Sequence, residues 1–185
     1  LIHDIWEAYD TLNPRNFQEV YHDLLALKEE SATLFSHGVI DLEARARTEA
    51  IFWATAKRIL AHLQTLDYVP EDLSGLGKML SDTYYCNFSI FQSLPDAWAV
   101  DHLFPIMPIH RLNEEPKRQA VLADLTCDSD GKLDRFIDLR GHDNATLKLH
   151  QPGESPYYLG AFLVGAYQET LGDLHNLFGD TNAVH

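Results

Sequence analysis

The spacing of apolar residues changes near Ser81, and this change constrains the fold more than any other feature of the 185-residue sequence. Before it, apolar residues recur every three or four positions, which is typical of helices that bury one face. After it, aromatic and β-branched residues gather in short runs between Gly, Pro and Asp, which is typical of strands and turns. We therefore predict an α+β chain, with a helical domain over residues 1–80 and a mainly β domain over residues 81–185.

The helical part contains two long predicted helices with recognisable ends. Asn13-Pro14 places a capping residue before a proline at the first helical position, and Gly38 is positioned to end that helix. Asp41 is expected to cap the second long helix, and a short last helix is expected from Pro70 to about Leu80. Two long helices that each carry one apolar face and are joined by a short connection predict an antiparallel helical bundle.

The second part contains several predicted strands and one helix. Strands are expected over 83–92, 120–126, 133–137 and 157–164, an edge strand or loop over 104–112, a polar loop over 141–155, and a helix over 166–177 that ends at Gly179. Alternation along the first strand places Cys86, Phe88 and Ile90 on one face. These elements predict a partial β-barrel or sandwich with one helix.

Charge and composition exclude two kinds of partner. The chain has 28 acidic and 14 basic residues, a formal net charge of −14, which argues against nucleic acid because phosphates require a basic face. No stretch approaches the ~20 apolar residues of a membrane span, so no membrane partner is expected.

Two cysteines are too few for a disulfide framework, which favours a reducing, cytoplasmic setting. The chain begins at Leu1 without an initiator Met, so we expect a piece of a longer protein.

The most distinctive local feature is L-T-C-D-S-D-G at 125–131, where an apolar strand delivers a thiol and two carboxylates to a turn. Strand ends that lead into loops often carry functional residues. The plainer interpretation, favoured on these residues alone, is an Asp-Gly turn next to a small buried Cys. A calcium loop does not fit, because Ile137 would stand where the bidentate Glu belongs. The histidines and cysteines also lack metal-ligand spacing, so no metal site is predicted.

Two further segments allow a functional and a structural interpretation. G-A-Y at 165–167 stands between a strand and a helix, whose free N–H groups suit a phosphate. A routine strand-to-helix turn with a packed Tyr explains these three residues better. N-F-S-I-F-Q-S-L-P-D-A-W at 87–98 is dense in aromatic and polar residues, and core aromatics with a turn explain it without a function.

Taken together, these segments resemble biosynthetic arginine decarboxylase. The resemblance rests on 87–98, on L-F-P-I-M-P at 103–108, on 125–131 and on L-V-G-A-Y-Q-E-T-L-G-D-L-H-N-L-F-G-D-T at 163–181. It is strong from about residue 81 to 185, and residues 1–80 are similar to the helical insertion of this family. The family pairs an (α/β)8 barrel with a β-domain and uses pyridoxal phosphate. The resemblance therefore implies the helical insertion and the β-domain part of such an enzyme, with the barrel domain missing.

The resemblance implies roles for three residues. Cys127 matches the family's catalytic proton donor, which is a general-acid task. Asp128 matches the residue that faces the distal cationic group of the substrate, and a carboxylate suits the donors of a guanidinium. Tyr167 matches the tyrosine near the cofactor phosphate. Candidates for supporting these three residues are Asn87, Asp96 and Asp130.

The resemblance also implies a reaction, a cofactor and partners. It implies conversion of L-arginine to agmatine and CO2 with pyridoxal phosphate, in polyamine (spermidine) biosynthesis, and it leaves a role for Mg2+ open. It implies a homo-oligomer in which the Cys-Asp loop reaches the active site of another subunit. None of the six lysines (28, 57, 78, 117, 132, 148) matches the Schiff-base lysine, so the 185 residues alone are expected to be inactive. Two alternatives stay open: another basic amino acid as substrate, or a non-catalytic oligomerisation or binding module.

Overall fold

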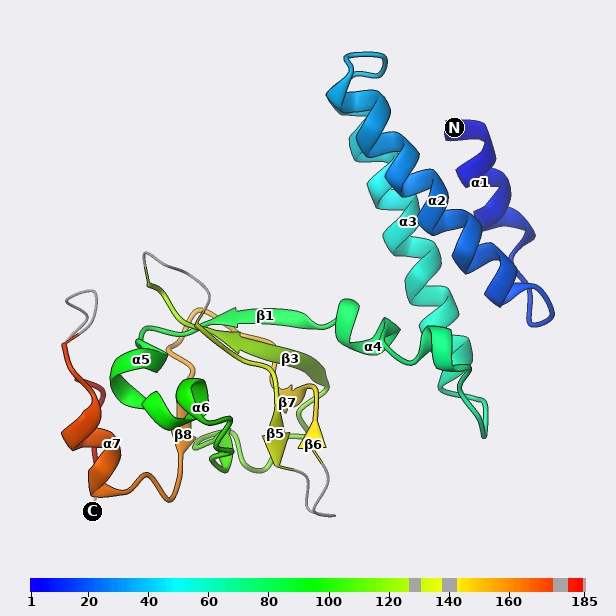
Figure 1. Ribbon diagram of the computed structural model, residues 1–185. Helices are drawn as coiled ribbons and strands as arrows, with labels where there is room; N and C mark the ends of the chain where they lie inside the picture. Colours follow the sequence, from blue (N-terminus) through cyan, green and yellow to red (C-terminus); the bar gives the residue numbers. More distant parts are fainter. Residues whose placement is uncertain (127–130, 138–142, 175–179, 185) are drawn as a thin grey trace. The chain divides into compact units, whose positions relative to one another are not determined.

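The computed structural model describes residues 1–126, 131–137, 143–174 and 180–184. The chain divides into two compact units, Leu1–Leu80 and Ser81–His185. Figure 1 shows helices in the first unit and short strands with short helices in the second. The predicted α+β class is confirmed, because helices precede strands that form open sheets, and the described residues contain no closed barrel.

Three helices make up most of the first unit: α1 (Ile2–Thr11), α2 (Phe17–Ser36) and α3 (Leu42–Leu63). The predicted cap of α3 is confirmed, since the Asp41 carboxylate accepts a hydrogen bond from the Ala44 amide at 2.8 Å. Gly38 ends α2 as predicted, because its φ of +70° lies in the left-handed region that glycine adopts without strain. None of the three helices, nor any other helix in the described ranges, has the length and apolar content that crossing a membrane requires.

Two helix boundaries in the first unit differ from the prediction. Asn13-Pro14 does not start α2, because residues 13–16 form a turn in which the Asn16 side chain accepts from the Asn13 amide at 2.7 Å. The short last helix is divided into a 3-10 turn, η1 (Glu71–Leu73), and α4 (Leu76–Met79). Gly75 lies at the break between them, where the low helix propensity of glycine favours an interruption.

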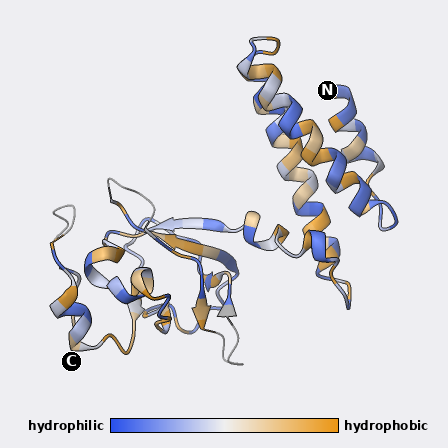
Figure 2. Cartoon of the chain, in the orientation of Figure 1, coloured by the Kyte–Doolittle hydropathy of each residue, from blue (hydrophilic) through white to orange (hydrophobic). Residues whose placement is uncertain are grey.

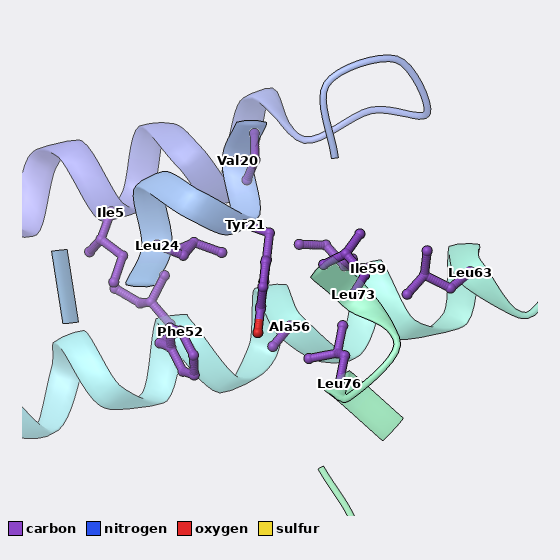
Figure 3. Packing of buried hydrophobic residues seen from close by; sticks show 11 residues of the cluster. Ile5, Val20, Tyr21, Leu24, Phe52, Ala56, Ile59, Leu63, Leu73 and Leu76 are labelled. Atoms are coloured by element: carbon purple, nitrogen blue, oxygen red, sulfur yellow. The ribbon is translucent and has the colours of Figure 1, made fainter. Parts of the chain in front are cut away.

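The core of the first unit is one apolar cluster to which every helical element contributes. Figure 3 shows these side chains meeting between the helices, and Figure 2 shows hydrophobic and hydrophilic positions alternating along α2 and α3. Burial of this one face on each helix supplies most of the stability of such a bundle. The buried members are Ile5, Val20, Tyr21, Leu24, Ile51, Phe52, Ala56, Ile59, Leu63, Leu73 and Leu76.

The second unit is built on a four-stranded sheet of β1 (Asp82–Tyr85), β3 (Arg118–Ala123), β4 (Lys132–Leu133) and β7 (Leu147–Leu149). β3 is its centre, paired with β1 in parallel and with β4 and β7 antiparallel. Two antiparallel pairs complete the strands: β2 (Ile106–Pro108) with β8 (Leu159–Ala161), and β5 (Phe136–Ile137) with β6 (Asp143–Asn144). The helices are α5 (Ile90–Ser93), α6 (Pro95–Ala99) and α7 (Ala166–Leu171).

The core of the second unit lies under the four-stranded sheet and combines strand and helix residues. Its centre is β3, where Ala120 and Leu122 point to the same buried side. The buried members are Ile90, Leu94, Phe104, Ala120, Leu122, Leu133, Phe136 and Leu149. These residues come from α5, β3, β4, β5 and β7 and from the segments between elements, so the strands depend on long-range packing.

Most predicted strands of the second unit are shorter or divided in the structure. The strand predicted over 83–92 ends at Tyr85 and is followed by α5. The strand predicted over 120–126 is confirmed as β3, which begins at Arg118 and ends at Ala123. The strand over 133–137 is divided into the ends of β4 and β5, and the strand over 157–164 is reduced to β8. The predicted polar loop over 141–155 contains β6 and β7, whereas the edge strand within 104–112 is confirmed as β2.

Two of these corrections have an identifiable cause. Ile90 begins a helix because its amide donates to the buried Asp124 carboxylate, a residue 34 positions away that no local pattern reveals. The helix predicted over 166–177 ends at Leu171, where Gly172 packs so closely that an added Cβ would lie 2.0 Å from the Gln92 carbonyl oxygen. Its predicted end at Gly179 lies outside the described residues.

Candidate functional site

Cys127, Asp128 and Asp130 lie outside the described residues, so the geometry of the predicted site is given by the residues that border them. Residues 124–126 follow β3 directly, and Gly131 precedes β4. The Cys86 amide donates to the Ala123 carbonyl at 2.8 Å, and the Leu125 amide donates to the Phe88 carbonyl at 3.4 Å. The segment that leads into Cys127 therefore runs beside the segment that leads into α5.

Asp124 is a buried carboxylate at this end of β3, only 3% exposed. One carboxylate oxygen accepts from the Ile90 amide at 2.9 Å, and the other accepts from the Thr126 hydroxyl at 3.1 Å. The Asp124 amide donates to the Gly131 carbonyl at 2.9 Å. These bonds tie Asp124 to both residues that border positions 127–130 and to the first residue of α5.

Gly131 has no room for a side chain in this arrangement. A Cβ at this position would lie 2.0 Å from Oδ2 and 2.4 Å from Oδ1 of Asp124. The glycine in the motif is thus required by close approach to a buried carboxylate. The sequence instead attributes this glycine to an Asp-Gly turn, because Asp and Gly both favour turns.

Tyr167 lies in the first turn of α7, and its side chain is 79% exposed. Its neighbour Gln168 is only 4% exposed and pairs with Asp96 of α6. The side-chain oxygen Oε1 of Gln168 accepts from the Asp96 backbone amide at 3.0 Å, and the side-chain Nε2 of Gln168 donates to the Asp96 carboxylate. This two-point contact fixes the rotation of α7, so that Gln168 lies inside and Tyr167 outside.

The structure distinguishes the other residues that sequence reasoning proposed for the site. Asp96 contacts the residue next to Tyr167, as a supporting residue would, whereas Asn87 is exposed.

Cys86 is partly buried after β1, and its Sγ lies 3.6 Å from the Tyr84 carbonyl. Burial raises the pKa of the Cys86 thiol to about 11, so this thiol stays protonated at neutral pH and is a poor nucleophile.

Two residues of the site were not predicted from the sequence. Asp124 gave a weak signal, because it is an acidic residue inside the otherwise apolar run 120–125. Gln168 gave none, since glutamine is an ordinary helix residue and its partner Asp96 lies 72 positions away. In the described ranges, no three His, Cys, Asp or Glu side chains are grouped as a metal ion would need.

A second polar cluster surrounds His150, which is 4% exposed. Its Nε2 lies 3.0 Å from the Glu114 carbonyl and must donate there, because a carbonyl only accepts. The Tyr157 hydroxyl lies 2.8 Å from Nδ1 and accepts a hydrogen bond from the His150 backbone amide at 3.0 Å. These contacts satisfy the His150 ring within the fold, which identifies the cluster as structural.

A groove of about 520 Å³ lies beside this cluster, lined by His110, Arg111, Glu114, Gln151, Gly153, Glu154, Ser155, Pro156 and Tyr157. The Arg111 guanidinium donates to the Glu114 carboxylate and to the Gln151 carbonyl. The ion pair lowers the pKa of Glu114 and raises that of Arg111. Glu114 therefore neutralises the Arg111 guanidinium at the surface of the groove.

Comparison with known proteins gives consistent results for the whole chain. Residues 1–77 match the arginine decarboxylase helical bundle domain family. All of the chain aligns, at 56% identity, with the biosynthetic arginine decarboxylases of Nostoc sp. and Gloeobacter violaceus, and covers 27% and 29% of those proteins. A crystal structure of the biosynthetic arginine decarboxylase SpeA from Campylobacter jejuni has a TM-score of 0.75 at 37% identity, over 97% of this chain and 27% of that one.

The helical bundle match and the two alignments extend the resemblance drawn from the motifs to all 185 residues. The chain spans less than a third of the curated relatives that it matches. The likeness to the Campylobacter jejuni structure covers both the helical unit and the strands that follow it. The chain is therefore similar along its whole length to proteins named biosynthetic arginine decarboxylase, and its residues 1–77 match the arginine decarboxylase helical bundle domain family.

Proposed function

We propose that these 185 residues are part of an arginine decarboxylase, which converts L-arginine to agmatine and CO2. The observation that carries the proposal is the identity of 50–56% along the entire chain with proteins named biosynthetic arginine decarboxylase. The described geometry supports it, because Asp124 and Thr126, which precede Cys127, and Gln168, which follows Tyr167, make buried polar contacts. Agmatine formation would place the enzyme in polyamine (spermidine) biosynthesis. We also propose that the enzyme is located in the cytoplasm.

Pyridoxal phosphate is the proposed cofactor, and Tyr167 is the residue of this chain that would contact its phosphate. The position fits, since the Tyr167 side chain is accessible while the next residue anchors α7. When bound, the cofactor accepts the electron pair that remains after CO2 leaves the α-carbon. No lysine of this chain matches the one that attaches the cofactor, so that residue belongs to another part of the enzyme.

Cys127 and Asp128 are proposed to act on the substrate itself. The Cys127 thiol would donate a proton to the α-carbon after CO2 has left, as a general acid. The Asp128 carboxylate would accept hydrogen bonds from the distal guanidinium, whose planar fork of donors favours a bidentate contact. This contact would select arginine over amino acids that end in a single ammonium group.

A substrate screen tests the proposed reaction. The full-length enzyme is incubated with pyridoxal phosphate and with arginine, ornithine, lysine or diaminopimelate, and both CO2 and the amine product are measured. We expect arginine to give the highest kcat/KM. Preference for another basic amino acid would replace the substrate, and no CO2 release from any of the four would favour a non-catalytic oligomerisation or binding module.

The 185-residue chain alone is proposed to be inactive, and the active form is proposed to be a homo-oligomer whose Cys127–Asp128 segment serves a second subunit. Mixing full-length Cys127→Ala with a full-length variant that lacks the cofactor lysine tests this arrangement. Mixed oligomers should regain part of the activity that each variant lacks by itself. No recovery on mixing would place Cys127 in its own subunit's site.

A comparison of kcat with and without EDTA tests the open question of Mg2+.

A further inference from the structure

Both segments of the proposed site are attached to the same short helical corner. This corner comprises α5 and α6, residues 90–99, and Figure 1 shows it beside α7. Its turns are closed by backbone bonds from the Leu94 amide to the Ile90 carbonyl and from the Ala97 amide to the Leu94 carbonyl, both 3.0 Å. The Phe91 and Trp98 rings pack edge to face at 5.2 Å across the corner.

The segment before Cys127 is attached to the first residue of the corner. Asp124 reaches from the end of β3 and accepts the Ile90 amide, which would otherwise be an unpaired donor at the start of α5. The same carboxylate accepts the Thr126 hydroxyl, one residue before Cys127. Burial makes these contacts strong, because a charged acceptor in a low dielectric forms stronger hydrogen bonds than one in water.

The segment that contains Tyr167 is attached to the middle of the corner. Gln168 pairs at two points with Asp96, the second residue of α6. Gln92, on α5, donates to the Asp180 carboxylate at 2.7 Å. Its carbonyl oxygen lies where a side chain on Gly172 would stand, so the end of α7 lies directly against α5.

We propose that the α5–α6 corner fixes residues 124–126, which lead into Cys127, relative to α7, which carries Tyr167, with Asp124 and Gln168 as positioning residues. The proposal rests on the proposed function, because it concerns how the proton donor and the cofactor contact share one site. Hydrogen bonds are directional, so they set the position of a segment more finely than apolar packing does. A displacement of about 1 Å costs on the order of 100-fold in rate.

The Asp96–Gln168 contact offers a test by exchange of partners in the full-length enzyme. Gln168→Glu places two carboxylates against each other, and like charges at this distance repel. The double variant Asp96→Asn with Gln168→Glu restores one donor and one acceptor, so it should recover the lost function. We expect Gln168→Glu to weaken pyridoxal phosphate binding by about tenfold or more, equivalent to at least about 1.4 kcal/mol, and the double variant to return to within a factor of about two. Glu169→Gln, on the exposed side of α7, is the matched control and should leave cofactor binding unchanged.

Asp124 is tested by a graded pair of variants. Asp124→Asn keeps an oxygen for the Ile90 amide, whereas Asp124→Ala removes both acceptors. We expect Asp124→Ala to lower kcat by about tenfold or more with cofactor affinity retained, and Asp124→Asn to lie between it and the parent. The two anchors are thus expected to affect different quantities, kcat for Asp124 and cofactor affinity for Gln168.

A purely structural role would give a different pattern. Variants that lower the melting temperature but leave kcat, KM and cofactor affinity at parent values would overturn the proposal. So would a double variant that fails to recover when Gln168→Glu alone is impaired. Absence of arginine decarboxylation by the parent enzyme would contradict the proposed function instead, so the two failures are distinguishable.

Discussion

The two units of this chain use buried polar groups in opposite ways. In Leu1–Leu80, Thr48 and Thr55 are completely buried, and each hydroxyl donates to the carbonyl four residues earlier in its own helix. In Ser81–His185, the buried Asp124 and Gln168 bond to residues 34 and 72 positions away. The helical unit is therefore organised by apolar periodicity, and the second unit by specific long-range polar contacts, which are also where the proposed site lies.

The largest effect is expected for loss of an apolar residue in the helical unit. Phe52 is completely buried and packs against Trp53 at 5.0 Å between ring centres. Phe52→Ala should lower the free energy of unfolding by about 3–5 kcal/mol through lost burial and a cavity, measured by chemical denaturation. Phe35→Ala is the matched control, because Phe35 is 37% exposed and its loss should cost about 1 kcal/mol or less. Equal costs would show that the apolar cluster does not dominate this unit.

In the second unit, the largest loss of stability is expected from a side chain that clashes with the buried Asp124 carboxylate. Gly131→Ala introduces a Cβ at 2.0 Å from the Asp124 carboxylate and should cost about 1–3 kcal/mol. Gly153→Ala is the control, since nothing lies within 4 Å of a Cβ there. If Asp124→Ala relieves the cost of Gly131→Ala, the carboxylate is the obstacle; additive costs in a double-variant cycle would refute this.

A smaller loss of stability is expected when the Tyr157 hydroxyl is removed from the His150 cluster. Tyr157→Phe removes the group that contacts the Nδ1 and the amide of His150, which leaves buried polar atoms without this partner. We expect a loss of about 1–2 kcal/mol in thermal or chemical denaturation. Tyr158→Phe provides the comparison, because Tyr158 is 57% exposed and should change stability by less than about 0.5 kcal/mol. A similar small change for both would mean that water replaces the Tyr157 hydroxyl.

The smallest change in stability is expected at the exposed Arg111–Glu114 ion pair. The guanidinium lowers the pKa of Glu114, so its folded-state value lies below the unfolded one. The contribution to stability is then present above the ordinary carboxyl pKa and is lost as the pH falls through the lowered value. The difference in melting temperature between the parent and Glu114→Gln should therefore shrink between pH 7 and pH 3. A constant difference would exclude ionisation as its cause, and Glu115→Gln serves as the control.

The sequence predicts the helical unit better than the second unit for a physical reason. Phe52, Ala56, Ile59 and Leu63 recur at helical spacing, and all four are buried on α3. By contrast, the run 83–92 has the composition of a strand, yet the Asp124 carboxylate caps a helix at Ile90. The motif 125–131 drew attention to the proposed site, but the carboxylate that explains its glycine belongs to a residue just outside it. Local patterns show periodicity, and they do not show a partner tens of residues away.

The most direct test of the central claim compares the two cysteines in the full-length enzyme. Cys127→Ser replaces the proposed proton donor, and Cys86→Ser replaces a partly buried thiol whose pKa burial raises to about 11. With L-arginine as substrate, we predict that Cys127→Ser lowers kcat by about 100-fold or more, in the range for loss of a general acid. Cys86→Ser should retain kcat within a factor of about two or three. Equal activity of the two variants would contradict the assignment of Cys127 and the account of this segment as part of the active site.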